Sequence, residues 1–294
     1  MTAEHDKSNS EQEQFSRRTM MAAAALAPVM LAATSTGASA QARATATLEY
    51  QPSGKVALVT GSSRGIGAAI AKRLARDGFK VTVNCVANRD LAASVVREIE
   101  AAGGAAIWEQ ADVSDPAAVR RLFAANDRAF GGVDVVVSNA GIMRLAPIKD
   151  MTDDDFDRMV AVNVKGSFNV LREASRRMRD RGRIITLSSS ITQLRSPTYA
   201  AYAATKAAQE IYANILAKEL EGRMISVNAL APGLVNTTLF TDGKTPEQIA
   251  GFAQRTPHKR LAEPADIANV VSTLCGEDGW WVSGETVFAN GGIV

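Results

Sequence analysis

Two tyrosines and one lysine in the segment "SPTYAAYAATKAA", residues 196 to 208, could carry out acid–base chemistry. Tyr202 and Lys206 are four residues apart and share one face if the segment is helical, whereas Tyr199 is seven residues before the lysine and Tyr212 follows it. A phenol has an ordinary pKa of about 10, so proton exchange near neutrality needs a nearby cation that stabilises the phenolate. Lys206 can supply that charge. A Tyr-x-x-x-Lys pair is weak evidence by itself, because surface helices also contain such pairs, but it makes Tyr202 the candidate proton donor.

A second candidate site is the glycine-rich turn "TGSSRGIG", which has glycines at positions 61, 65 and 67. It follows the apolar run "KVALVT" and precedes a segment with helical apolar spacing that ends at Gly78. Glycine allows a sharp turn and a close approach to a pyrophosphate, and a helix N-terminus supplies N–H groups and a positive dipole. Structural turns use glycine too, but the position between the first strand and the first helix favours a dinucleotide-binding turn.

Apolar runs that alternate with amphipathic segments must position both groups. The runs read "KVALVT", "KVTVNC", "AAIWEQ", "VDVVVSN", "RIITLS", "MISVNAL" and "ETVFA". Strands without polar alternation, separated by helices, indicate a parallel sheet that is covered on both faces. We therefore predict a single doubly wound α/β domain of the Rossmann type over residues 54–294, with about seven parallel strands and the ligand beyond their carboxyl ends.

The end of the second predicted strand bears on the choice of cofactor. Asn84, Cys85 and Val86 occupy the region where a cofactor with a free ribose 2′-hydroxyl would need a carboxylate. Arg64 in the turn and Arg89 after the strand could pair with a 2′-phosphate. This pattern favours NADP over NAD, which stays the alternative. In the plainer interpretation Arg64 is a solvated turn residue and Arg89 simply starts the next helix.

Six motifs occur in order in the predicted domain: "TGSSRGIG", "SNAG" at 138 to 141, "VNVKG" at 162 to 166, "LSSS" at 187 to 190, "YAATK" at 202 to 206 and "APG" at 231 to 233. Together they resemble the short-chain dehydrogenase/reductase family, and the similarity runs from about Gly54 to Val294. Within the family the chain looks most like 3-oxoacyl-thioester reductases and sugar or polyol dehydrogenases.

The resemblance implies a catalytic set of Asn163, Ser189, Tyr202 and Lys206. The family has a serine thirteen residues before the tyrosine that holds the substrate oxygen, which selects Ser189 from three consecutive serines. Asn163 matches the asparagine that helps to hold a proton-relay water. Tyr202 would donate a proton to a carbonyl oxygen as hydride arrives from NADPH, and the reverse direction would oxidise an alcohol. Lys206 would lower the pKa of the tyrosine and bind the nicotinamide ribose.

The resemblance also implies the residues that surround the cofactor. Residues 139 to 141 would support the sheet centre beside it, and the segment from 232 to 237 would form the loop beside the nicotinamide. Asp112, after the third predicted strand, either bonds the adenine ring or helps to cap the next helix. The predicted cofactor-binding residues are Gly61, Ser63, Arg64, Gly65, Ile66, Gly67, Arg89, Asp112, Val113, Asn139, Ala140, Gly141, Tyr202, Lys206, Pro232, Gly233, Val235 and Thr237.

The substrate is expected to be a small carbonyl or alcohol compound. We expect its pocket to be lined by Met143 and Arg144, by residues 193 to 197 and by the loop from 234 to 258, a stretch of mixed polarity. Arg144 or Arg195 could contact an anionic substrate or face solvent. The alternative function is a sensor or structural module that binds NADP(H) without turnover.

Composition excludes several other classes. Lys and Arg total 33 against 31 Asp and Glu, so no overall field would attract nucleic acid. The two histidines and two cysteines are too few and too isolated for a metal site or a disulfide framework. Trp280 and Trp281 are expected in the core or in a subunit contact, and the resemblance implies a homo-oligomer, commonly a tetramer.

The first 53 residues differ in composition from the rest. Arg17 and Arg18 precede an apolar run over 22–33, and two overlapping A-x-A sites end at Ala40 or Ala42. Residues 1–42 therefore resemble a twin-arginine export signal, with a linker over 43–53, and predict a periplasmic protein. The run is too short to span a bilayer, so no stable membrane insertion is expected. A disordered Ala-rich leader on a cytoplasmic protein is the alternative.

Overall fold

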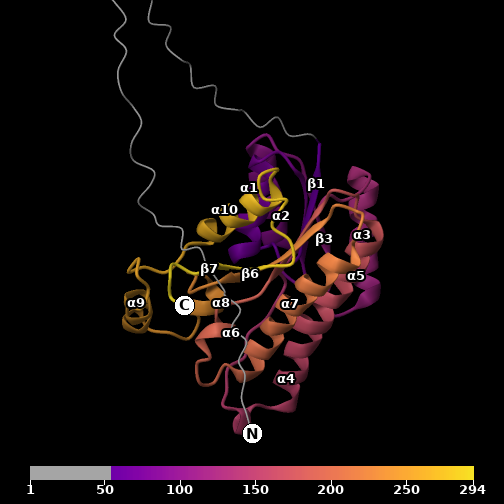
Figure 1. Cartoon of the computed structure of the whole chain (residues 1–294). Helices are drawn as coiled ribbons and strands as arrows, with labels where there is room; N and C mark the ends of the chain where they lie inside the picture. The colour runs from indigo at the N-terminus through magenta and orange to yellow at the C-terminus, as the bar shows by residue number, and fades with distance from the viewer. Residues whose placement is uncertain (1–53) are drawn as a thin grey trace, which may run out of the picture. The chain divides into compact units, whose positions relative to one another are not determined.

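The computed structural model describes residues 54–294, so the predicted signal and linker lie outside the described residues. One sheet of seven strands, all paired in parallel, forms the centre of the domain in the order β3-β2-β1-β4-β5-β6-β7 (Figure 1). The predicted strands and the doubly wound fold are confirmed. The strands are β1 (Val56–Val59), β2 (Lys80–Cys85), β3 (Ala106–Gln110), β4 (Val135–Ser138), β5 (Arg183–Leu187), β6 (Ser226–Pro232) and β7 (Thr286–Ala289).

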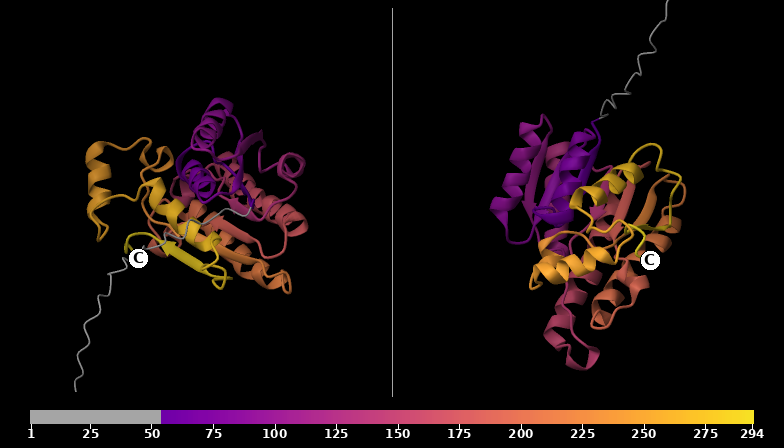
Figure 2. Two further views of the ribbon diagram at one scale, coloured as in Figure 1. Left: turned by 90° about the horizontal axis from the view of Figure 1, so that it is seen from above. Right: turned by 90° about the vertical axis from the view of Figure 1, so that its left-hand side faces the viewer.

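Long helices cover both faces of the sheet (Figures 1 and 2). One apolar layer packs α1 (Gly65–Arg76), α2 (Arg89–Ala101) and α10 (Pro264–Cys275) on the sheet. The other packs α3 (Pro116–Phe130), α5 (Ser167–Arg177) and α7 (Ala200–Glu219). The shorter helices are η1 (Ile148–Asp150), α4 (Asp153–Met159), the π-helical turn η2 (Val160–Gly166), α6 (Ile191–Leu194), α8 (Thr238–Thr241) and α9 (Pro246–Gln254). Figures 1 and 2 show α9 and its flanking loops projecting from the side of the domain.

The strand order reverses at β1, which pairs with β2 on one side and β4 on the other. Leu58 lies opposite Thr82 of β2 and Val136 of β4 in the register. In a doubly wound sheet this switch point opens a crevice beyond the carboxyl ends of the strands. The glycine turn after β1 and the segment after β4 therefore meet there.

Two asparagine side chains hold the glycine turn in place. Asn84 accepts a hydrogen bond from the backbone N of Gly61 through Oδ1 (3.1 Å), and Nδ2 of Asn139 donates to the carbonyls of Thr60 (2.8 Å) and Gly61 (3.0 Å). Gly61 has φ +62° and lies against Ala140, where a Cβ atom would approach the Ala140 Cα to 2.9 Å. The close packing of this turn excludes any larger residue.

The exposed turn after α10 contains the two adjacent tryptophans. Trp280 and Trp281 are 40% and 83% exposed and contact each other edge to face. The alternative that they lie in the core is wrong, because the chain leaves the apolar layer after α10, and the alternative of a subunit contact stays a prediction. Cys85 and Cys275 are buried as free thiols in one apolar cluster.

The described residues include neither a membrane-spanning helix nor a metal-binding cluster. None of the helices within 54–294 is long and apolar enough to cross a membrane. Within the same range no three His, Cys, Asp or Glu side chains are grouped so that they could hold a metal ion.

Two glycine-to-alanine substitutions should have opposite effects on stability. A Cβ atom at Gly67 would lie 2.4 Å from the Gly61 carbonyl oxygen, whereas one at Gly251 in α9 would have no neighbour within 4 Å. Gly67→Ala should lower the free energy of unfolding by about 1–3 kcal/mol, because the glycine turn must shift. Gly251→Ala should raise it by up to about 1 kcal/mol through helix propensity. Urea unfolding of both variants measures the difference, and equal shifts of the same sign would contradict the packing described.

Candidate active site

Two neighbouring cavities lie beyond the carboxyl ends of the strands. One, of about 480 Å³, is lined by Ser189, Tyr202 and Lys206. The other, of about 230 Å³, is lined by the glycine turn and by the residues after β2 and β3. Both are bounded by Ile66, Asn139, Gly141, Thr237 and Leu239, so they share a wall. The fold thus places the two groups singled out in the sequence side by side.

Tyr202 lies in the first turn of α7 and is only 7% exposed. Burial raises the pKa of its phenol well above the ordinary value, and a hydrogen bond with Ser189 lowers it by less. The expected lowering by Lys206 is not seen, because burial dominates and the Nζ atom is 5.7 Å from the tyrosine ring centroid. The phenol is therefore in its acid form at neutral pH and can donate a proton.

Lys206 is buried one helical turn after Tyr202. Its Nζ donates a hydrogen bond to the Leu187 carbonyl at the end of β5 (2.7 Å). Burial lowers the pKa of the ammonium to about 8. A group with that pKa is mostly charged at pH 7 and gives up its proton readily, which suits a residue that resupplies a neighbouring phenol.

The three serines after β5 are distinguished by their hydrogen bonds. Ser188 donates to Glu210, and Ser190 donates to the Ala231 carbonyl. Ser189 accepts a bond from the backbone N of Ile191 (3.3 Å), and it is the serine whose hydroxyl acts to lower the pKa of Tyr202. These contacts support the choice of Ser189 by its spacing from the tyrosine.

Glu210 connects α7 to the loop that carries Ser189. Its Oε1 accepts hydrogen bonds from Ser188 Oγ (2.7 Å) and Thr192 Oγ1 (2.9 Å), which flank Ser189 in the sequence. Glu210 follows Lys206 by four residues and so lies on the same face of α7. The helix that bears Tyr202 thereby also orients the serine. We did not predict this residue, although its spacing from Lys206 was a usable signal.

Asn163 lies in the π-helical turn η2, behind the wall of the larger cavity. Its side chain bonds the backbone N and O of Ile142, both at 2.9 Å, and Nδ2 also donates to Thr205 Oγ1 (3.0 Å). Its carbonyl accepts a hydrogen bond from Gln209 Nε2 (2.6 Å). Asn163 therefore joins the segment after β4 to α7, and its expected role in holding a water stays a prediction.

The N-terminus of α1 fits the pyrophosphate of a dinucleotide. The backbone N–H groups of Gly65, Ile66 and Gly67 have no protein acceptor within the described part of the chain, and the first turn contains no acidic residue. These groups line the smaller cavity and carry the positive end of the helix dipole. The sequence prediction of an anion-binding turn is consistent with this geometry.

The two arginines proposed for a 2′-phosphate differ in position. Arg64 is exposed and lines the smaller cavity. Arg89 does not line it, and its Nε donates to Oε1 of Gln110 (2.7 Å). Val86 lines the cavity where a carboxylate would select NAD. All other predicted cofactor-binding residues line one of the two cavities.

Asp112 lines the smaller cavity as part of a hydrogen-bonded cluster. It accepts bonds from the N and Oγ of Ser114 and from Arg158 (3.0 Å). Burial raises its carboxyl pKa, but these bonds outweigh burial and lower the pKa overall. Asp115, not Asp112, caps α3 by accepting from the N of Ala117, so the capping alternative for Asp112 is wrong. Arg158 also lines this cavity and was not predicted.

Comparison with known proteins identifies the family. A family model described as Enoyl-(Acyl carrier protein) reductase matches residues 61–294. The chain is similar to a solved short-chain dehydrogenase from Burkholderia cenocepacia in complex with NADP, with 38% identity, a TM-score of 0.77 and coverage of 82% of this chain and 98% of that chain. It belongs to the short-chain dehydrogenase/reductase family.

Curated members of the family are also similar over most of their length. A versicolorin reductase of Emericella nidulans is 42% identical over 255 residues, 83% of this chain and 97% of that protein. An NADPH-dependent aldehyde reductase-like protein of Arabidopsis thaliana is 42% identical over 255 residues, 82% of this chain and 94% of that protein. The alignment therefore spans the domain that carries both cavities.

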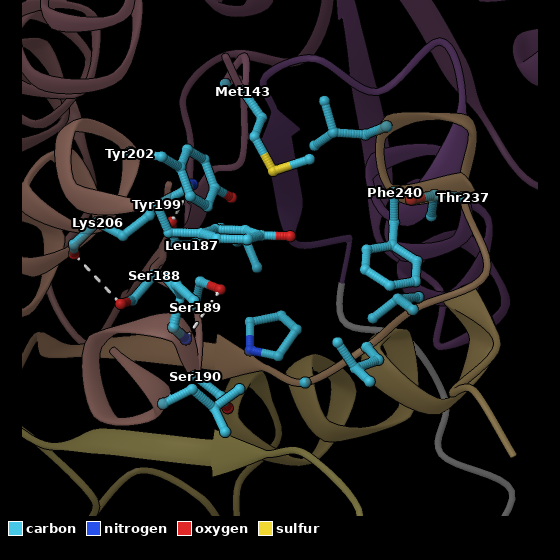
Figure 3. A pocket seen from close by; sticks show the side chains of 18 of the residues that line it. Met143, Leu187, Ser188, Ser189, Ser190, Tyr199, Tyr202, Lys206, Thr237 and Phe240 are labelled. Atoms are coloured by element: carbon cyan, nitrogen blue, oxygen red, sulfur yellow. Dashed lines mark hydrogen bonds between the residues drawn. The ribbon is translucent and has the colours of Figure 1, made fainter. Parts of the chain in front are cut away.

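The substrate side of this short-chain dehydrogenase/reductase is more apolar than its sequence suggested. Figure 3 shows Tyr199 and Tyr202 on one side of the larger cavity, with Thr237 and Phe240 facing them across it. Met143 lines it as predicted. From the predicted loops Leu194, Ser196, Pro197, Leu234, Leu239, Phe240, Phe252 and Arg255 line it, most of them apolar.

The two arginines proposed for an anionic substrate do not line the larger cavity. Arg144 forms an ion pair with Asp155 (3.3 Å), and Arg195 ends α6 with an exposed side chain. Tyr199 and Arg255 were not singled out in the sequence. Tyr199 was considered only as a competitor of Tyr202, and no local pattern marks Arg255.

Proposed function

We propose that the protein is an NADP(H)-dependent oxidoreductase that interconverts a ketone or aldehyde and an alcohol, with Asn163, Ser189, Tyr202 and Lys206 as the catalytic set. The observation that carries the proposal is the buried Tyr202 phenol, which together with Ser189 and Lys206 lines a cavity that adjoins the glycine turn. Its raised pKa keeps the proton on the phenol until an acceptor of high basicity forms. An alkoxide produced by carbonyl reduction is such an acceptor.

Residues of the catalytic set have separate roles in the proposed reduction. Ser189 and Tyr202 hydroxyls bind the carbonyl oxygen, which orients the carbonyl carbon and stabilises negative charge on the oxygen. Tyr202 then transfers its proton to that oxygen. A bound NADPH would supply the hydride. Lys206 returns a proton to the tyrosine, and the apolar wall around Met143 and Phe240 limits the access of water.

Preference for NADP over NAD has three supports. Residues 86–88, which directly follow β2 and line the smaller cavity, include no carboxylate, and Arg64 lines the same cavity. The solved short-chain dehydrogenase contains NADP. The relative from Arabidopsis is named NADPH-dependent.

Replacement of Tyr202 distinguishes an enzyme from a module that binds NADP(H) without turnover. Tyr202→Phe should lower kcat for carbonyl reduction by at least about 10³-fold, because the variant lacks the hydroxyl that donates the proton, while the NADPH affinity stays within about twofold. Tyr212→Phe is the matched control, because Tyr212 lies on the same helix but lines neither cavity. NADPH absorbance with a panel of aldehydes and ketones measures turnover, and fluorescence titration measures binding. Near-normal turnover by Tyr202→Phe would remove this residue from the mechanism.

Replacement of Arg64 tests the cofactor preference. Arg64→Gln should weaken NADPH binding by about tenfold or more and leave NADH binding nearly unchanged, because only NADPH carries the 2′-phosphate. Arg89→Gln is the control from outside the cavity and should change neither affinity. Equal losses for both cofactors in Arg64→Gln would show that Arg64 does not recognise the 2′-phosphate.

The proposal includes export through a twin-arginine signal over residues 1–42, which would place the enzyme in the periplasm; the cytoplasm is the alternative. The support is the Arg17-Arg18 pair ahead of an apolar run and A-x-A sites. Fractionation of cells that express the full chain should find the protein in the periplasm, and a double Arg17→Lys, Arg18→Lys variant should stay in the cytoplasm. A wild-type protein confined to the cytoplasm would exclude export.

We also propose a homotetramer. Phe168 of α5 and Ile211 and Ile215 of α7 are large apolar residues with exposed side chains, which suits a buried contact between subunits. Light scattering measures the mass, and a monomer would contradict the proposal.

A further inference from the structure

The charged side chains that line the larger cavity are all basic. Of the side chains that line it, only Lys206 and Arg255 are charged, and none is acidic. Lys206 is bonded to the Leu187 carbonyl deep in the site. Arg255 is therefore the one charged group of this lining whose side chain has no hydrogen bond or ion pair within the described residues.

Arg255 stands at the C-terminal end of α9. Its side chain has no ion pair or hydrogen bond within the described part of the chain, and its guanidinium lies 5.7 Å from the Phe252 ring centroid. Two other exposed arginines differ, because Arg144 pairs with Asp155 and Arg260 with Asp266. A cation at a helix C-terminus is favoured by the dipole, but that interaction leaves the donors of the guanidinium free for a ligand.

The positive charge of Arg255 influences the phenol of Tyr199 in the wall of the cavity. Tyr199 lines the same cavity, and burial raises the pKa of its phenol while Arg255 lowers it. The ring of Tyr199 is 6.5 Å from the ring of Tyr202, centroid to centroid. On this wall Tyr199 therefore lies next to Tyr202, the candidate proton donor, and Arg255 acts electrostatically on Tyr199.

The wall opposite the two tyrosines is suited to a flat apolar group. Phe240 and Phe252 contact each other edge to face with centroids 5.3 Å apart, and both line the cavity. Figure 3 shows Phe240 across the cavity from the two tyrosines. Aromatic side chains on opposite walls favour an aromatic ring between them.

We propose that Arg255 is a specificity-determining residue that binds an acidic group, a carboxylate or a phenolate, at the end of an aromatic carbonyl substrate opposite to the reacting carbonyl. The inference rests on the proposed function, since Ser189 and Tyr202 hold the carbonyl end. Arginine forms paired, charge-assisted hydrogen bonds to a carboxylate. In this arrangement the ring occupies the aromatic wall and separates the acid from the carbonyl.

A matched pair of aldehydes tests the proposal. 4-Formylbenzoate and methyl 4-formylbenzoate share the ring and the reacting carbonyl and differ in charge. We expect wild-type kcat/KM with NADPH to be at least about tenfold higher for the acid than for the ester. Arg255→Gln should reduce this ratio by about tenfold or more, mainly through KM of the acid, and Arg255→Lys should restore part of it. Arg195→Gln is the control, because this exposed arginine does not line the cavity.

The outcomes separate the inference from the proposed function. An acid-to-ester ratio near one in the wild type, or a ratio unchanged by Arg255→Gln, overturns the role of Arg255 and leaves the reductase intact. If neither aldehyde is reduced, the proposed function fails for this class, and calorimetric binding of 4-formylbenzoate to the NADPH complex decides the inference by itself. Weaker binding in Arg255→Gln than in Arg195→Gln then supports it, and equal or undetectable binding in all proteins overturns it.

Discussion

The polar face that α7 buries is the constraint on which the site depends, because each buried polar group needs a hydrogen-bond partner. Lys206 bonds β5, Thr205 and Gln209 bond Asn163, and Glu210 bonds the serine loop. These bonds fix α7 against the last residues of β5 and against the π-helical turn. The same contacts that stabilise the position of α7 also position the proton donor Tyr202.

The cofactor and substrate sides are built in different ways. The cofactor side is formed mainly by backbone groups, namely closely packed glycines and N–H groups that have no acceptor within the described residues. Two asparagine side chains hold these backbone groups in place. The substrate side is formed by side chains, and part of it comes from α8, α9 and their loops, which project beside the sheet. Backbone geometry tolerates changes in neighbouring side chains, whereas a cavity of side chains changes with each substitution. This explains why family membership follows readily from the chain and the substrate does not.

The parts of the structure that follow from local rules could be predicted from the sequence. The strands, the glycine turn and the Tyr202-Lys206 pair depend on residues close together in the chain, and the structure places them as expected. Features that depend on distant contacts were missed. Nothing local brings Arg255 to the cavity that Tyr199 lines, or exposes Trp281. The raised pKa of Tyr202 depends on burial by residues such as Met159 and Ile191.

The two buried cysteines have a consequence for the redox behaviour of the enzyme. Burial raises the pKa of the Cys275 thiol to about 12 and also raises that of Cys85. Oxidants and disulfides react with the thiolate, which is scarce at neutral pH when the pKa is raised and is shielded when the side chain is buried. Both thiols are consequently poorly reactive while the domain stays folded, so an oxidising environment would leave them as free thiols.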